Sequence, residues 1–260
     1  MLSDFLCPPL NSKGDFFMSV QNALSKKQSN QQKVKNIVMS ALFCALAYVT
    51  MFVFRIRVAG FLTFDAKDAI ITLSGLLFGP LSSLAISLTV AFIEMISVST
   101  TGLWGFLMNF LASATFSCTA AIIYKYKHNI KGAILGLVCS VFSTTAMMLI
   151  LNLLITPIYT GSSTAAIAGM IPTILFPFNL TKSVLNASLV LVLYKPISRA
   201  MKATGIVKIA ERKKVELTRE EKKRKRILNF VVFGIGALLV AASILVFVFI
   251  LGGNIKFFDK

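Results

Sequence analysis

The stretch that decides the fold runs from residue 61 to residue 110 and reads FLTFDAKDAIITLSGLLFGPLSSLAISLTVAFIEMISVSTTGLWGFLMNF. Apolar segments flank it on both sides. Its landmarks are an ionisable cluster, a helix-breaking dipeptide, one carboxylate within an apolar run and an aromatic, glycine-containing loop, namely Asp65, Lys67, Asp68, Gly79-Pro80, Glu94 and Trp104. A few polar groups set into long apolar runs predict a membrane protein with one polar binding site.

The composition also indicates a membrane protein. Of 260 residues, 56% are hydrophobic and only 14% are charged, whereas a soluble domain averages about 25% charged residues. The four cysteines show no paired spacing and mostly lie in apolar runs, so they are interpreted as packing residues. The single histidine, His128, lies in a basic loop. We therefore expect no metal site and no resident cofactor.

The formal net charge of +17 is concentrated in three blocks that adjoin apolar spans. Residues 195–226 hold thirteen Lys or Arg against four Glu, and further basic blocks lie in residues 1–36 and 125–131. This arrangement follows the positive-inside rule and favours attraction to anionic lipid at the cytoplasmic surface. Lipid, rather than nucleic acid, is the predicted partner of these charges.

The run Ala69–Ile96 is either one long tilted helix or a hairpin that turns at Gly79-Pro80. A single crossing would place the basic 125–131 loop on the opposite side from the other basic blocks. A hairpin places all of them on the cytoplasmic side, and proline after glycine suits a turn between two helices. The sequence therefore predicts the hairpin.

The fold class predicted is an all-α integral membrane protein, with a six-helix bundle and one appended C-terminal transmembrane helix. The expected order is a disordered cytoplasmic tail, a membrane domain, a basic cytoplasmic linker, the additional helix and a short tail, over residues 1–33, 34–200, 201–226, 227–251 and 252–260. The expected spans are Ile37–Phe54, the two arms of Ala69–Ile96, Leu103–Tyr124, Gly132–Ile155, Gly169–Tyr194 and Ile227–Leu251. The N-terminus would be cytoplasmic and the C-terminus extracellular, in a multi-pass protein of the cell membrane.

Two ionisable side chains lie deep in the predicted spans, Glu94 and Lys182. Such groups are costly in a bilayer unless they are paired or face a cavity. They have opposite charge, so one interpretation is that they simply pair with each other. The other is that they face a ligand, because Asn179, Lys182 and Asn186 recur at helical spacing and form a polar stripe. Asn109 and Asn152 would add further amide groups, unless each only bonds a neighbouring helix.

Two further features have alternative interpretations. Trp104, with Phe61, Phe64 and Phe106, forms either an interfacial aromatic belt or a cap on a flat aromatic ligand. Ala41 and Ala45, four residues apart, allow close approach of another helix, which is either a partner protein or a neighbour within the bundle.

Several catalytic motifs are absent from the sequence. It contains no G-x-x-x-x-G-K-[ST] phosphate-binding loop, no H-E-x-x-H and no G-x-S-x-G. We therefore expect no catalytic residues, and an enzyme is the weaker class.

A combination of segments resembles a known family. In chain order they are LTFDAKD, LLFGPLSSL, TTGLWGFLMNFLA, LNLLITPIY and IPTILFPFNLTKSVLNA, between about residues 36 and 200. They resemble the riboflavin-specific substrate-binding subunit, or S component, of energy-coupling factor (ECF) transporters. Residues 201–260 lie outside the resemblance.

The resemblance implies a six-helix subunit that binds riboflavin from outside and passes it on with a transmembrane coupling subunit and two ATPases. It implies that Ala41 and Ala45 contact the coupling subunit, and that Asn152 and Lys182 hold the flavin. Asn109 and Asp65, in the Asp65–Asp68 loop, are weaker transfers. Asn179, Trp104 and Glu94 complete the candidate ligand-binding set, although the family gives no role to Glu94.

Three alternatives remain open at this stage. One is a self-sufficient ion-coupled carrier that uses Glu94 as a proton relay. Another is a variant that binds the flavin nucleotides FMN or FAD. The third is a membrane scaffold organised by residues 195–226 and the last helix, which would bind no small molecule.

Overall fold

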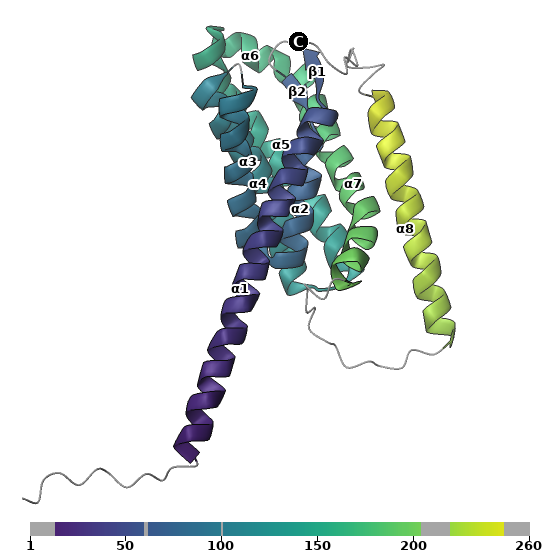
Figure 1. The fold of residues 1–260 in the computed structure, drawn as a ribbon. Coiled ribbons are helices and arrows are strands. Elements are labelled where there is room, and N and C mark those ends of the chain that lie inside the picture. The colour runs from purple at the N-terminus through teal and green to yellow at the C-terminus, as the bar shows by residue number, and fades with distance from the viewer. Residues whose placement is uncertain (1–13, 60–61, 100, 204–218, 247–260) are drawn as a thin grey trace, which may run out of the picture. The chain divides into compact units, whose positions relative to one another are not determined.

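The computed structural model describes residues 14–59, 62–99, 101–203 and 219–246. The chain divides into two units, residues 1–39 and 40–260. Its elements, drawn in Figure 1, are α1 (Gly14–Val53), β1 (Ile56–Ala59), β2 (Leu62–Phe64), α2 (Lys67–Phe78), α3 (Pro80–Ser97), α4 (Gly102–Tyr126), α5 (Ile130–Thr160), α6 (Thr164–Met170), the π-helical turn η1 (Ile171–Leu175), α7 (Phe176–Ala203) and α8 (Arg219–Leu245).

Five helical segments in the described part of the chain are long and apolar enough to cross a membrane: Lys33–Val53, Pro80–Ser97, Gly102–Tyr126, Ile130–Thr160 and Thr164–Ala200. The apolar part of α8, Phe230–Leu245, is shorter. The nearly all-helical fold confirms the predicted class of an all-α membrane protein. The last predicted span continues to residue 251, and its end lies outside the described residues, as do most of the predicted linker and the short tail.

The hairpin predicted at Gly79-Pro80 is present. Gly79 has φ 101° and links α2 directly to α3, a conformation that favours glycine, and Pro80 opens α3 with the φ that a first helical turn needs. Gly75 lies where the two arms meet, because a Cβ atom there would lie 2.9 Å from the Cβ of Ser83. The two arms of the hairpin therefore run antiparallel in close contact. The start of α2 and the end of α3 lie at the same end of this pair.

Helix α2 has only 12 residues, and the side chains from Lys67 to Leu76 are all buried. It contacts α3, α4 and α7, so protein rather than lipid surrounds it. A helix enclosed in this way needs no lipid-facing side and no full membrane length. Its position in the interior explains how the ionisable residues of its first turn come to lie inside the bundle.

Three local features differ from the sequence prediction. Helix α1 begins at Gly14, so it includes residues assigned to a disordered tail; residues 14–33 contain no proline to stop a helix. A bulged antiparallel pair of strands, β1 and β2, replaces the expected plain loop. The expected sixth span begins with α6 and the π-helical turn η1. In this turn the Phe176 N–H donates to the Ile171 carbonyl, five residues back, and a proline follows each of these two residues.

Packing at one end of the bundle fixes the strands. Leu62 and Phe64 of β2 are buried against Ile167 of α6 and against Leu175, Phe178 and Leu185 of η1 and α7. This apolar contact holds the segment between β2 and α2 over the side of α7 that carries the predicted polar stripe.

Candidate ligand-binding site

The first part of the site is an ion pair inside the α2–α3 hairpin. Lys67 is 1% exposed and its Nζ lies 2.5 Å from Oε2 of Glu94, near the end of α3. The same Nζ lies 3.5 Å from Oδ2 of Asp65, which precedes α2. Because the arms of the hairpin are antiparallel, residues 67 and 94 meet even though 27 positions separate them.

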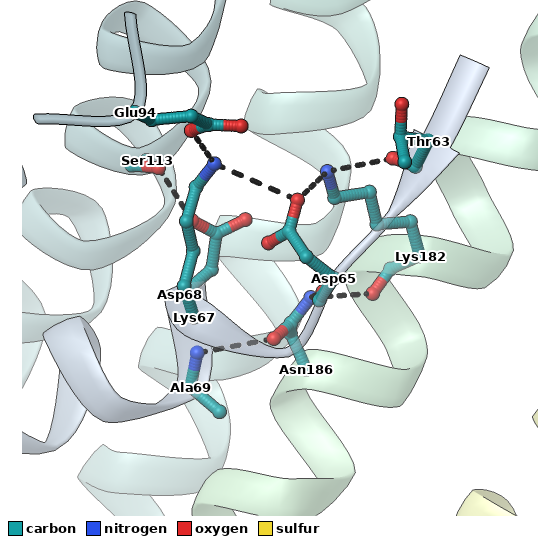
Figure 2. Close-up of polar contacts among 9 residues, drawn as sticks. All are labelled: Thr63, Asp65, Lys67, Asp68, Ala69, Glu94, Ser113, Lys182 and Asn186. Atoms are coloured by element: carbon teal, nitrogen blue, oxygen red, sulfur yellow. Dashed lines mark hydrogen bonds and ion pairs between the residues drawn. The ribbon is translucent and has the colours of Figure 1, made fainter. Parts of the chain in front are cut away.

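Helix α7 supplies the second part. Lys182 Nζ donates to Asp65 Oδ2 at 3.1 Å and to the Thr63 carbonyl at 3.4 Å. One turn further along, the Asn186 amide accepts from the Ala69 N–H at 3.0 Å and donates to the Asp65 carbonyl at 3.3 Å. Figure 2 shows these contacts. Lys182 and Asn186, one turn apart on the same side of α7, thus hold the start of α2 in place from one side.

The charges form an alternating chain of Glu94, Lys67, Asp65 and Lys182. Burial by itself would raise the pKa of Asp65, but the ammonium groups of Lys182 and Lys67 outweigh it and lower that pKa to about 2. Asp65 therefore carries its negative charge at neutral pH. Beside the chain, Ser113 Oγ donates to Asp68 Oδ1 at 2.5 Å. The idea that Glu94 and Lys182 pair directly is wrong, since each has a different partner.

These residues border a cavity. It holds about 950 Å³ of space free of protein atoms, part of which is its open mouth. Its apolar lining includes Leu62, Met108, Ala112, Phe116, Met148 and Phe178. Its polar lining includes Arg55, Asp65, Asp68, Glu94, Asn109, Thr144, Asn152, Tyr159, Asn179, Lys182 and Asn186. Apolar surfaces with a few convergent polar groups are typical of a site for a small organic ligand.

Three buried polar atoms have no hydrogen-bond partner among the described residues, namely Arg55 Nη1, Asp65 Oδ1 and Thr144 Oγ1. All three residues line the cavity. A buried polar group left without a partner costs about 1–3 kcal/mol, so atoms of this kind are where a bound ligand contributes most.

The structure brings six of the seven predicted ligand-binding residues to this cavity: Asp65, Glu94, Asn109, Asn152, Asn179 and Lys182. Trp104 does not line it. Its side chain is 39% exposed on α4, which fits the aromatic-belt interpretation better than the cap. Phe64, by contrast, is 3% exposed and belongs to the apolar core.

Several cavity residues are not predicted by the sequence, among them Arg55, Thr144 and Tyr159. Nothing in their spacing marks them, because α5 is apolar on most of its surface and Arg55 lies outside any predicted span. Lys67 and Asp68 were noted as charged, but their burial follows only from the enclosure of α2.

Ala41 and Ala45 lie on the exposed side of α1. Phe43, Ala47 and Met51 of the same helix are buried, and the Phe43 ring packs edge-on against Phe78. The side that carries Ala41 and Ala45 therefore does not pack against the described part of the chain.

No group of three or more His, Cys, Asp or Glu side chains placed to hold a metal ion occurs in the described ranges. The fold and the cavity thus define a membrane-embedded protein with a binding site for a small organic molecule.

The particular family follows from comparison with known proteins. Residues 35–194 match the family model described as "ECF transporter, substrate-specific component". The chain belongs to this family. The resemblance found in the sequence is thereby confirmed.

Two relatives support the same assignment. The chain is 29% identical over 185 residues to the riboflavin transporter RibU of Staphylococcus aureus (strain TCH60), which covers 68% of this chain and 97% of the relative. A solved structure described as "Structure and mechanism of the S component of a bacterial ECF transporter" superposes with a TM-score of 0.56 at 26% identity, over 65% of this chain and 99% of that one.

Proposed function

We propose that this protein binds riboflavin from outside the cell and delivers it to a shared ECF module of one coupling subunit and two ATPases. The observation that carries the proposal is the cavity, in which four asparagine side chains, Lys182 and Asp65 converge between apolar and sulfur-containing side chains. Amide and ammonium groups suit the carbonyls and ribityl hydroxyls of the vitamin, and the apolar lining suits its ring. The name of the S. aureus relative supports the same ligand.

The experiment that tests the ligand begins with the purified protein. We expect a yellow preparation that releases about one riboflavin per chain on denaturation, identified by mass spectrometry. Titration of the emptied protein with riboflavin, followed by quenching of flavin fluorescence, then gives the dissociation constant. A colourless preparation that also fails to quench added flavin would refute the proposal.

Lys182 provides the matched variant. We expect Lys182→Met to raise the dissociation constant for riboflavin at least about tenfold, because a hydrogen bond from a charged donor contributes about 1.5–3 kcal/mol. The control is Lys131→Met, which removes an exposed lysine at the start of α5, outside the cavity lining. Equal affinities in the two variants would remove Lys182 from the binding site.

Delivery to the coupling subunit would use α1. Ala41 and Ala45 are exposed while the opposite side of α1 is buried, so a second protein has access to them. Small residues at this spacing permit close helix contact in a membrane. We expect Ala41→Trp combined with Ala45→Trp to preserve riboflavin binding and to abolish uptake in cells. Retained uptake would contradict this interface.

The proposed orientation follows from the basic blocks. The cavity is built from the ends of α3 and α7 that lie away from the basic 125–131 loop, so it would open outward, with the N-terminus cytoplasmic and the C-terminus extracellular. The ion pair of Glu94 with Lys67 gives this carboxylate a structural partner, which weighs against a free proton relay.

A further inference from the structure

Asp65 lines the cavity and has one carboxylate oxygen without a hydrogen-bond partner among the described residues. The residue is 4% exposed. Both lysines that contact it do so at Oδ2, with Lys182 Nζ at 3.1 Å and Lys67 Nζ at 3.5 Å. In Figure 2 the dashed lines converge on this single oxygen. The other oxygen, Oδ1, is buried and has no hydrogen-bond partner among the described residues. A charged acceptor is therefore held in a fixed position with its bonding capacity unused.

A donor lies beside this acceptor. Lys182 Nζ has three protons, and the hydrogen bonds made within the described ranges use two of them, at Asp65 Oδ2 and at the Thr63 carbonyl. Lys182 also lines the cavity. The wall thus offers an acceptor and a donor side by side, which complements a ligand with a donor next to an acceptor.

The surroundings favour a rigid planar ligand group over a flexible chain at this position. Asp65 is held by two ion pairs, and its backbone carbonyl is fixed by Asn186. Pre-organised groups bind a rigid partner with the least loss of conformational entropy. Ala112 and Phe116 of α4 line the same cavity, as do Met148 and Phe178, and these side chains suit the faces of a flat ring.

We propose that Asp65 Oδ1 accepts the imide N–H of the flavin ring, while Lys182 donates to a carbonyl next to that N–H. This inference rests on the proposed function and assigns the pyrimidine edge of the ring to the Asp65–Lys182 pair. The site then selects planar ligands that carry an unsubstituted imide. A ligand without that N–H leaves Asp65 Oδ1 buried and unpaired.

The test uses the full chain with three ligands: riboflavin, 3-methylriboflavin, in which a methyl group replaces the imide hydrogen, and lumiflavin, which keeps the imide and lacks the ribityl chain. We expect the native protein to bind riboflavin about 10- to 100-fold more tightly than 3-methylriboflavin, as the loss of a hydrogen bond to a buried charge implies. This ratio is measured on the native protein and does not depend on the folding of any variant.

Asp65→Ala locates the effect. The ratio between riboflavin and 3-methylriboflavin should fall to about threefold or less in this variant, since its acceptor is gone. The ratio between riboflavin and lumiflavin should stay as in the native protein. A native protein that binds riboflavin and 3-methylriboflavin equally would overturn the inference and leave the proposed function intact.

The remaining outcomes are also decisive. If Asp65→Ala instead changes the ratio between riboflavin and lumiflavin, the carboxylate binds the ribityl chain and the inference is wrong. If the ratio between riboflavin and 3-methylriboflavin persists in Asp65→Ala, another group binds the imide and the inference is also wrong. A native protein that binds none of the three flavins would overturn both the inference and the proposed function.

Discussion

The Lys67–Glu94 pair allows a prediction whose size follows from the geometry. Replacing Lys67 with methionine keeps the volume of the side chain but removes the hydrogen-bonded cation from Glu94, which is 5% exposed. Breaking a buried pair from one side costs about 3–5 kcal/mol. At about 2–4 °C per kcal/mol for a chain of this size, the unfolding midpoint should fall by about 6–20 °C.

Glu94→Gln should cost less, because Lys67 keeps Asp65 at 3.5 Å and the new amide oxygen can still accept its proton. We expect a loss of about 1–2 kcal/mol, or about 2–8 °C. The double variant should be less destabilised than the sum of the single variants, by about 1–3 kcal/mol, since neither charge is then left alone.

The assay is thermal unfolding in detergent, followed with a dye that reacts with thiols as they become exposed. Cys44, Cys118 and Cys139 are free and half-buried in the folded chain, so they report unfolding. Lys131→Met, at an exposed position, is the control. Strict additivity in the double variant would refute the energetic coupling of Lys67 with Glu94. Equal losses in the two single variants would refute the expected difference between them.

Two further predictions concern the hairpin and the carboxylate. Gly75→Ala should lower the unfolding midpoint in the same assay, because its Cβ would lie 2.9 Å from Ser83 and 3.1 Å from Ala121, and overpacking costs about 1–3 kcal/mol. The control is Gly234→Ala in α8, where no atom lies within 4 Å of the new Cβ, so the midpoint should not fall. Equal effects of the two substitutions would argue against close contact at Gly75. Riboflavin affinity should stay constant from pH 8 to pH 5, because the pKa of Asp65 is lowered to about 2. The contribution of the Asp65 carboxylate to stability is complete above about pH 3.9, the pKa of an unfolded aspartate. That contribution is lost as the pH falls through about 2. Burial and the Asp65 carboxylate raise the pKa of Asp68, which also lines the cavity. A fall in affinity between pH 7 and pH 5 that persists in Asp68→Asn, measured by flavin titration, would therefore contradict the ionised state of Asp65.

The sequence determined the features that depend on local pattern. Long apolar runs predicted the membrane helices, because they depend only on neighbouring residues. Gly79-Pro80 predicted the hairpin together with the positions of the basic blocks along the chain. The polar stripe of Asn179, Lys182 and Asn186 was visible for the same reason, since helical spacing alone puts these side chains on one side. All three line the cavity.

Only the tertiary structure decided which groups meet. Asp65 and Lys182 are 117 positions apart, and their contact depends on how β2 packs against α6 and α7. Glu94 pairs with Lys67 because the hairpin sets the rotation of α3 about its own axis. The same kind of rotation turns Trp104 outward on α4 and Thr144 inward on α5. Sequence spacing fixes which residues share a side of a helix, but the direction of that side is set by packing against helices that are distant along the chain.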